Sequence, residues 1–162
     1  MKSIALIDTS IFCEVLDVPS KASDAGKIRK ELERKVAADE VLLLPMTAVI
    51  ETGNHIGQCS SDGGLRRKVA MRFVGAVLKA MKGKAPFTPT PFFESVALEK
   101  WLAEFPEWAV RTDPKGKGSG LGDLTIQKEW DRQRELNPGR RVYIWSKDQH
   151  LSSYDTDNPP AI

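Results

Sequence analysis

The chain has 162 residues, of which 41% are hydrophobic and 28% are charged, so it is long enough for one domain with a substantial core and short for two. Its net charge of +2 is too small to indicate nucleic-acid binding by itself, and no apolar run approaches the roughly 20 residues that span a bilayer. Two cysteines without metal-ligand spacing, and a first apolar run that is not preceded by a signal peptide, predict a reduced, cytoplasmic protein without membrane contact.

The first half of the chain alternates buried strands with helical patterns. The run from Ile4 to Ile7 has no polar break, which predicts a strand buried on both faces, and a second such run covers Val41–Leu44. Apolar residues at helical spacing predict a helix after each strand, a charged helix between them and a basic helix afterwards. These helical segments are 11–16, 21–38, 47–57 and 65–82.

The segment from Ala85 to Val110 is less regular. Three prolines between Ala85 and Pro91 argue against regular structure there. The pattern then predicts a helix over 94–105 that Pro106 ends, followed by a short strand at 108–110.

A glycine-rich basic loop leads to a helix that Gly122 opens and Asn137 ends, and Val142–Trp145 is a third strong strand. Strands that alternate with helices predict an α/β fold with a mainly parallel central sheet flanked by helices. We expect one domain over residues 1–155 and a flexible tail over 156–162.

Four acidic residues stand where strands give way to helices. Asp8 and Asp148 follow buried strands, Glu51 lies in the first turns after another, and Asp123 starts a helix after the glycine-rich loop. Because parallel strands put their carboxyl ends at one edge, all four acids can face one pocket. Their repulsion would be relieved by a cation with oxygen ligands, Mg²⁺ or Mn²⁺. The alternative is that some of them only cap helices.

These motifs together resemble the PIN-domain nucleases, the fold of the VapC-type toxins in toxin–antitoxin pairs. The resemblance covers nearly the whole chain, in the order of the family's motifs. It is carried by the segments Ile7–Ser10, Thr47–Glu51, Gly120–Ile126 and Ser146–Asp148. Asp8, Asp123 and Asp148 match the family's principal metal-binding acids.

The resemblance implies a three-layer PIN-like fold and metal-dependent cleavage of RNA by an activated water. Glu51 matches the acid on the helix after the second strand, and Ser10 and Ser146 match supporting polar positions. The resemblance also implies an antitoxin partner and a homodimer, for which the Ile28/Leu32/Val36 stripe or the 65–82 helix offers a contact surface.

RNA binding would rest on cations near the acids. The candidates are Lys115, Lys117, Lys147, Arg66 and Arg67. Three other readings stay open: a non-catalytic PIN-like module that binds RNA or protein, a structure-specific DNA nuclease, and a phosphatase of the haloacid dehalogenase type. The last is disfavoured because its chemistry wants a second aspartate where this chain has Ser10. His55 and His150 lie near the acids in sequence, but packing or surface roles are favoured for both.

Overall fold

The computed structural model describes residues 1–111, 116 and 118–157, and its centre is a sheet of four parallel strands. The order across the sheet is β3-β2-β1-β4, so β1 is flanked by β2 and β4. The strands are β1 (Ile4–Ile7), β2 (Val41–Leu44), β3 (Phe87–Pro89) and β4 (Val142–Trp145). The predicted α/β class with a parallel sheet flanked by helices is confirmed, and the arrangement is consistent with a three-layer PIN-like fold.

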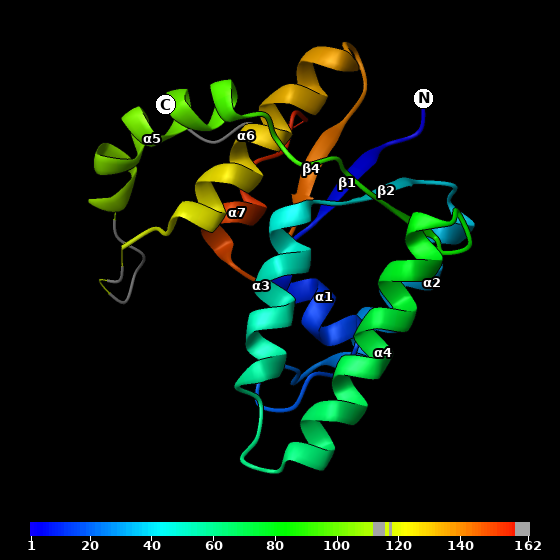
Figure 1. Cartoon of the computed structure of the whole chain (residues 1–162). Coiled ribbons are helices and arrows are strands. Elements are labelled where there is room, and N and C mark those ends of the chain that lie inside the picture. The colour runs from blue at the N-terminus through cyan, green and yellow to red at the C-terminus, as the bar shows by residue number, and fades with distance from the viewer. Residues whose placement is uncertain (112–115, 117, 158–162) are drawn as a thin grey trace.

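Four helices form the layer on one face of the sheet (Figure 1). Alternate strand residues such as Ala5, Leu42 and Tyr143 belong to this layer's core, because neighbouring residues in a strand face opposite ways. Phe12 is fully buried there, with its ring centroid 5.6 Å from that of Phe87. The helices are α1 (Thr9–Val15), α2 (Ala25–Ala37), α3 (Met46–Gly57) and α4 (Gly63–Met81).

A second core covers the other face. Ile4, Leu6 and Ile144 pack there with Ile126 and Trp130 of α6 (Leu121–Leu136). The short helix α7 (Gln149–Ser152) adds to this layer, and α5 (Ser95–Ala109) packs on α6. The sheet therefore lies between two helical layers, and residues distant in sequence meet at its edges.

The prediction of irregular structure over 85–91 was wrong, because the edge strand β3 lies within it. Among the residues that the structure describes, β3 pairs only with β2, so it lies at the edge of the sheet. Pro89 stands at its last residue, where a missing N–H is tolerated.

The predicted helix end at Pro106 and the predicted strand at 108–110 were also wrong, because α5 continues to Ala109. Trp108 explains the continuation. Its side chain is 4% exposed, and its Nε1 donates to the Gly120 carbonyl at 3.1 Å. This contact holds the last turn of α5 against the start of α6 and offsets the hydrogen bond that a proline cannot donate.

The Ile28/Leu32/Val36 stripe on α2 faces mainly inward. Ile28 is 6% exposed and Leu32 packs against the core, whereas Val36 is 46% exposed. The helix starts at Ala25, so Lys21 falls in the loop before it. Most of this stripe is therefore already covered by the chain's own core.

Cys13 and Cys59 are both buried, and neither forms a disulfide. Within residues 1–111, 116 and 118–157, no helix has the length and apolar character needed to cross a membrane. In the predicted flexible tail, Thr156 is bonded to the backbone of Val142, and 158–162 lie outside the described residues.

Candidate active site

Asp8 joins β1 to α1, and its side chain is almost completely buried. Its backbone N–H donates to the Trp145 carbonyl at 3.0 Å, which extends the pairing with β4 by one residue. Its Oδ2 accepts hydrogen bonds from the hydroxyls of Ser146 at 2.7 Å and Ser10 at 2.9 Å, and caps α1 through the Ser10 N–H at 3.4 Å. The two serines thus supply the donors that a buried carboxylate requires.

Glu51 reaches the same region from α3. Its Oε2 accepts a hydrogen bond from the Thr9 hydroxyl at 2.8 Å. Its Oε1 lies against Gly122, where a Cβ atom would stand only 1.7 Å away, so glycine is what lets the carboxylate lie there. Burial raises the pKa of Glu51, the Thr9 hydrogen bond lowers it, and the charge of Asp8 raises it; the net shift is upward.

The first turn of α6 carries Asp123. Two contacts fix this turn: the hydrogen bond from Trp108 to Gly120, and a 2.7 Å hydrogen bond between the hydroxyls of Thr125 and Thr47. The second of these ties α6 to the start of α3. An acid in a first helical turn is favoured by the helix dipole. Asp123 is thereby placed opposite α1 and α3.

A pocket of ≈ 270 Å³ lies between these three segments. Three of the four predicted acids, Asp8, Glu51 and Asp123, line it, although they come from β1, α3 and α6. The complete lining is Asp8, Thr9, Ser10, Cys13, Lys21, Glu51, His55, Asp123 and Lys147. The carboxyl ends of the parallel strands and the helix starts beside them converge here, which is where α/β sheets form their binding crevices.

Asp148, the fourth predicted acid, does not line this pocket. Its side chain is exposed, and its Oδ1 accepts a 2.8 Å hydrogen bond from the His150 N–H as the cap of α7. Its own N–H donates to the Ser146 hydroxyl at 2.9 Å. Asp148 therefore caps α7 and is not one of the acids that line this pocket, and its place in the site stays a prediction.

Lys147 lines the pocket, but its ammonium group is held by a buried acid that sequence reasoning missed. Glu14 is completely buried, and its Oε1 lies 2.6 Å from the Lys147 Nζ. Asp24 adds a second contact at 3.2 Å. Burial alone would raise the pKa of Glu14, but the hydrogen bonds from Lys147 and from the N–H groups of Ser23 and Asp24 bring it below its ordinary value.

The other predicted RNA-binding cations lie elsewhere. Arg66 is half-buried, and its Nη1 donates to the Ser60 carbonyl at 2.7 Å. Arg67 is exposed, and neither arginine lines the pocket, because the first turn of α4 lies beyond the far end of α3 (Figure 1). Lys115 and Lys117 lie outside the described residues. Lys21, on the loop before α2, is a cation that lines the pocket and that sequence reasoning missed.

The two histidines differ in their surroundings. His55 lines the pocket, and burial lowers its pKa, with the charge of Lys21 acting in the same direction. The ring of His150 packs between Trp108 and Tyr154, with centroid distances of 5.4 Å and 5.7 Å. His150 is therefore a packing residue, and His55 is the histidine at the pocket.

The oxygen donors of Asp8, Glu51 and Asp123 are the kind that Mg²⁺ and Mn²⁺ prefer. As the side chains stand, no three His, Cys, Asp or Glu residues in the part of the chain that the structure describes are grouped closely enough to hold a metal ion. The donor set thus fits a hard divalent cation in chemistry, while an ion would have to draw the carboxylates closer together.

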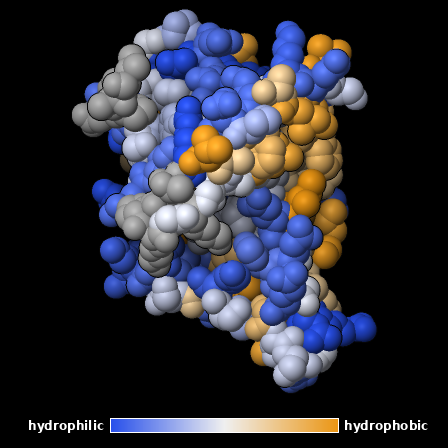
Figure 2. Space-filling model, turned by 90° about the vertical axis from the view of Figure 1, so that its left-hand side faces the viewer, coloured by the Kyte–Doolittle hydropathy of each residue, from blue (hydrophilic) through white to orange (hydrophobic). Residues whose placement is uncertain are grey.

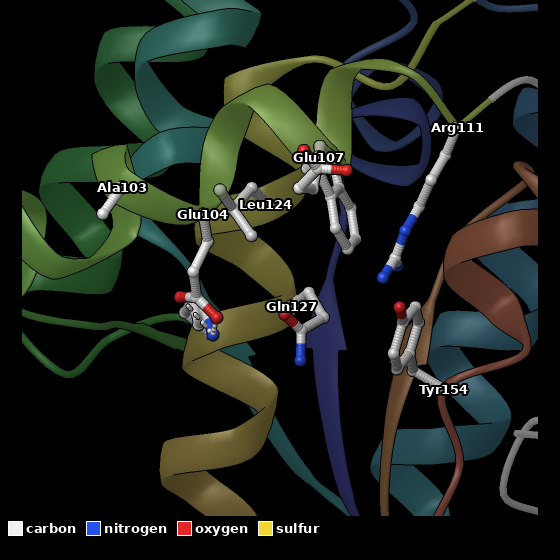
Figure 3. Close-up of a pocket in the computed structure, with 9 residues that line it drawn as sticks. Ala103, Glu104, Glu107, Arg111, Leu124, Gln127 and Tyr154 are labelled. Carbon is white, nitrogen blue, oxygen red and sulfur yellow. Dashed lines mark hydrogen bonds and ion pairs between the residues drawn. The ribbon is translucent and has the colours of Figure 1, made fainter.

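A second pocket of ≈ 490 Å³ opens between α5 and α6 (Figure 3). Trp108 and Leu124 form its apolar part, and Gln127 and Tyr154 contribute polar groups. The guanidinium of Arg111 lies over the Trp108 ring, 4.7 Å from its centroid. Leu124 lines this second pocket and directly follows Asp123, which lines the acidic pocket. Neighbouring residues of α6 therefore line the two pockets.

No protein-family model matches the chain, and no curated protein has a matching sequence.

Proposed function

We propose that this protein is a divalent-cation-dependent endoribonuclease of the PIN type. One observation carries the proposal: three acids from β1, α3 and α6 line a single pocket at the carboxyl edge of a parallel sheet. Carboxylates that come together from separate segments repel one another. A bound divalent cation would relieve this repulsion, so the arrangement favours a cation-binding centre.

In this proposal, Asp8, Glu51 and Asp123 hold Mg²⁺ or Mn²⁺, which supplies Lewis-acid activation of water and charge neutralisation at phosphorus. The chain's own groups orient the centre. The hydroxyls of Ser10 and Ser146 fix one oxygen of Asp8, as their 2.9 Å and 2.7 Å hydrogen bonds indicate. Burial and the charge of Asp8 raise the pKa of Glu51 in the protein alone, and a bound cation would favour the charged carboxylate and offset that rise.

RNA is proposed as the substrate on the strength of the PIN resemblance. Lys21 at the pocket would contact a phosphate, while Lys147 is already paired with Glu14. A cytoplasmic location, a cognate antitoxin and the role of toxin are parts of the same proposal and rest on the same resemblance.

The non-catalytic module is the second candidate, and the position of Asp148 favours it. That acid caps α7 and does not line the pocket. A module of this kind would bind RNA or protein without cleaving it.

Incubation of the protein with labelled RNA and labelled DNA, with Mg²⁺ or Mn²⁺ and with or without chelator, tests the proposal. We expect RNA cleavage that the chelator abolishes and that Asp8→Asn lacks. Binding of RNA without cleavage would support the module. Cleavage of DNA alone would assign a DNA nuclease, and cleavage that survives both chelator and Asp8→Asn would refute the proposed centre.

A further inference from the structure

Four large apolar side chains lie exposed on the outer face of α4. Met71, Val74, Leu78 and Met81 are 64%, 49%, 47% and 62% exposed. Residues three and four apart share one side of a helix, so the four form a single row. The opposite side of α4, which includes Val77, is buried in the core. The exposed row is therefore not needed for the fold of one molecule.

The charges beside this row are all positive. Residues 63–84 contain seven Lys and Arg residues and no acid. Lys68, Lys79 and Lys82 are exposed and, by helical spacing, lie along one side of the row. Two α4 helices placed face to face would bring these cations together, which is unfavourable. The structure thus argues against the 65–82 helix as a symmetric dimer contact.

A groove of ≈ 500 Å³ runs beside the row, between α4, α2 and the residues before β3. Gly75 lies in its wall, with no atom within 4 Å of the place where a Cβ atom would stand. A glycine within a helix is destabilising relative to alanine. Here it leaves open space in the groove wall between Met71 and Lys79.

The outer face of α5 has the opposite charge. Its cap residue and helix together, residues 94–109, hold four glutamates and one lysine, and one of these acids, Glu104, is already paired with Lys128 of α6 at 2.7 Å. Val96 is 64% exposed, and Ala103, seven residues on, lies exposed on the same side. Glu99 and Glu107 are exposed on either side of this line. The exposed acids of α5 are opposite in charge to the exposed cations of α4.

We infer that the α4 face of one molecule binds the α5 face of a second copy, head to tail. The two faces lie on opposite sides of the molecule (Figure 1), so they cannot meet within one chain. A contact between two different surfaces is heterologous, and it continues into rings or filaments rather than stopping at a dimer. The inference is independent of the proposed nuclease activity.

Analytical ultracentrifugation of the full chain tests this arrangement. We expect the wild-type protein to assemble, and less so as salt rises, because exposed charges are screened. An α4 variant, Leu78→Ser/Lys79→Gln, and an α5 variant, Val96→Ser/Glu99→Gln, should each weaken association about tenfold or more. Leu136→Ser, at a side chain that is 61% exposed on α6, is the matched control and should assemble as the wild type does.

Mixing the two variants gives the decisive result. Each variant retains one intact face. In an equimolar mixture, the intact α4 face of one variant should bind the intact α5 face of the other, and the two altered faces should prevent assembly beyond a 1:1 dimer. A monomeric wild type, continued assembly of either variant alone, or a mixture that stays monomeric would overturn the inference. So would binding of α4 to anionic phosphatidylserine vesicles with self-assembly unaffected by the α4 variant. Circular dichroism of each variant checks that it is folded.

Discussion

Asp8 and Asp148 occupy similar places in the sequence and very different places in the molecule. Each follows a buried strand, β1 or β4, and the two strands are neighbours in the sheet. Each caps a helix. Yet Asp8 is 5% exposed and lines the acidic pocket, whereas Asp148 is exposed and does not line it.

The register of the two strands explains the difference. Ile7 pairs with Trp145, so the residue of β4 that corresponds to Asp8 is Ser146, which donates its hydroxyl to the Asp8 carboxylate. Asp148 comes two residues later, after the chain has turned towards α7. A strand end brings an acid to the correct edge of the sheet, but the exact offset from the strand decides whether it faces the pocket.

The largest expected effect separates these two acids directly. Asp8→Asn should lower the rate of RNA cleavage about 10²–10³-fold, the cost of losing one essential electrostatic contact in an active site. Asp148→Asn should change it less than about threefold, because the amide still accepts the capping hydrogen bond. Cleavage rates of the two variants, measured side by side, check this. Similar losses in both would show that Asp148 also takes part in the metal centre.

Lys147 directly precedes Asp148 in the sequence and is paired with the buried Glu14. Substitution of Glu14 provides the next test. Glu14→Gln should lower the free energy of unfolding by about 2–3 kcal/mol, because a buried, charge-assisted contact is lost. Arg132→Gln breaks an exposed ion pair with Glu129 and serves as the control, at about 0–1 kcal/mol. Urea unfolding measures both.

The same pair has a defined pH dependence. The pKa of Glu14 is lowered in the folded protein, so its contribution to stability is complete above its ordinary pKa and is lost as the pH falls through the lowered value. The difference between wild type and Glu14→Gln should therefore shrink in acid, and a difference that grows there would contradict the ion pair.

Gly122 provides a test of the position of the Glu51 carboxylate. Gly122→Ala would place a Cβ atom 1.7 Å from the present position of the Glu51 Oε1, so the carboxylate must move away. We expect activity to fall about 10–100-fold, as for other residues that orient a metal ligand, with little change in stability because the end of the Glu51 side chain can rotate. Gly120→Ala, with nothing within 4 Å of its added Cβ, is the control.

The smallest expected effect is on the free energy of unfolding at neutral pH, which the buried charge of Glu51 lowers. Its pKa is raised, so the folded state binds the proton more tightly and loses stability as the pH rises from the ordinary value of 4.5 through the raised one. Glu51→Gln removes this cost. The variant should be more stable than wild type at neutral pH, and the gain should disappear below pH 4.5; thermal melts across pH check the sign.

Much of the fold could be predicted from local patterns. The apolar runs Ile4–Ile7, Val41–Leu44 and Val142–Trp145 each form a strand of the parallel sheet. Trp130 of α6 and Trp145 of β4 are buried, at 4% and 6% exposed. β3 and the last turn of α5 could not be predicted, because pairing with β2 and burial of Trp108 are tertiary contacts that override the local preference of proline.

The candidate site divides in the same way. The acids Asp8, Glu51 and Asp123 could be placed at one edge, because strand order and helix starts determine that position. Glu14 could not be recognised as the partner of Lys147, although an acid between Cys13 and Val15 in an apolar helix face was a usable signal. Its partner is more than one hundred residues away in sequence, and no local pattern encodes that contact.

Direct measurement of Mn²⁺ binding by isothermal titration calorimetry tests the central claim, that Asp8, Glu51 and Asp123 form a divalent-cation centre. The wild-type protein and Asp148→Asn should bind Mn²⁺ with similar affinity, and Asp8→Asn should bind at least about tenfold more weakly. A wild-type protein that binds no Mn²⁺, or an Asp8→Asn variant that binds it as tightly as wild type, would contradict the account.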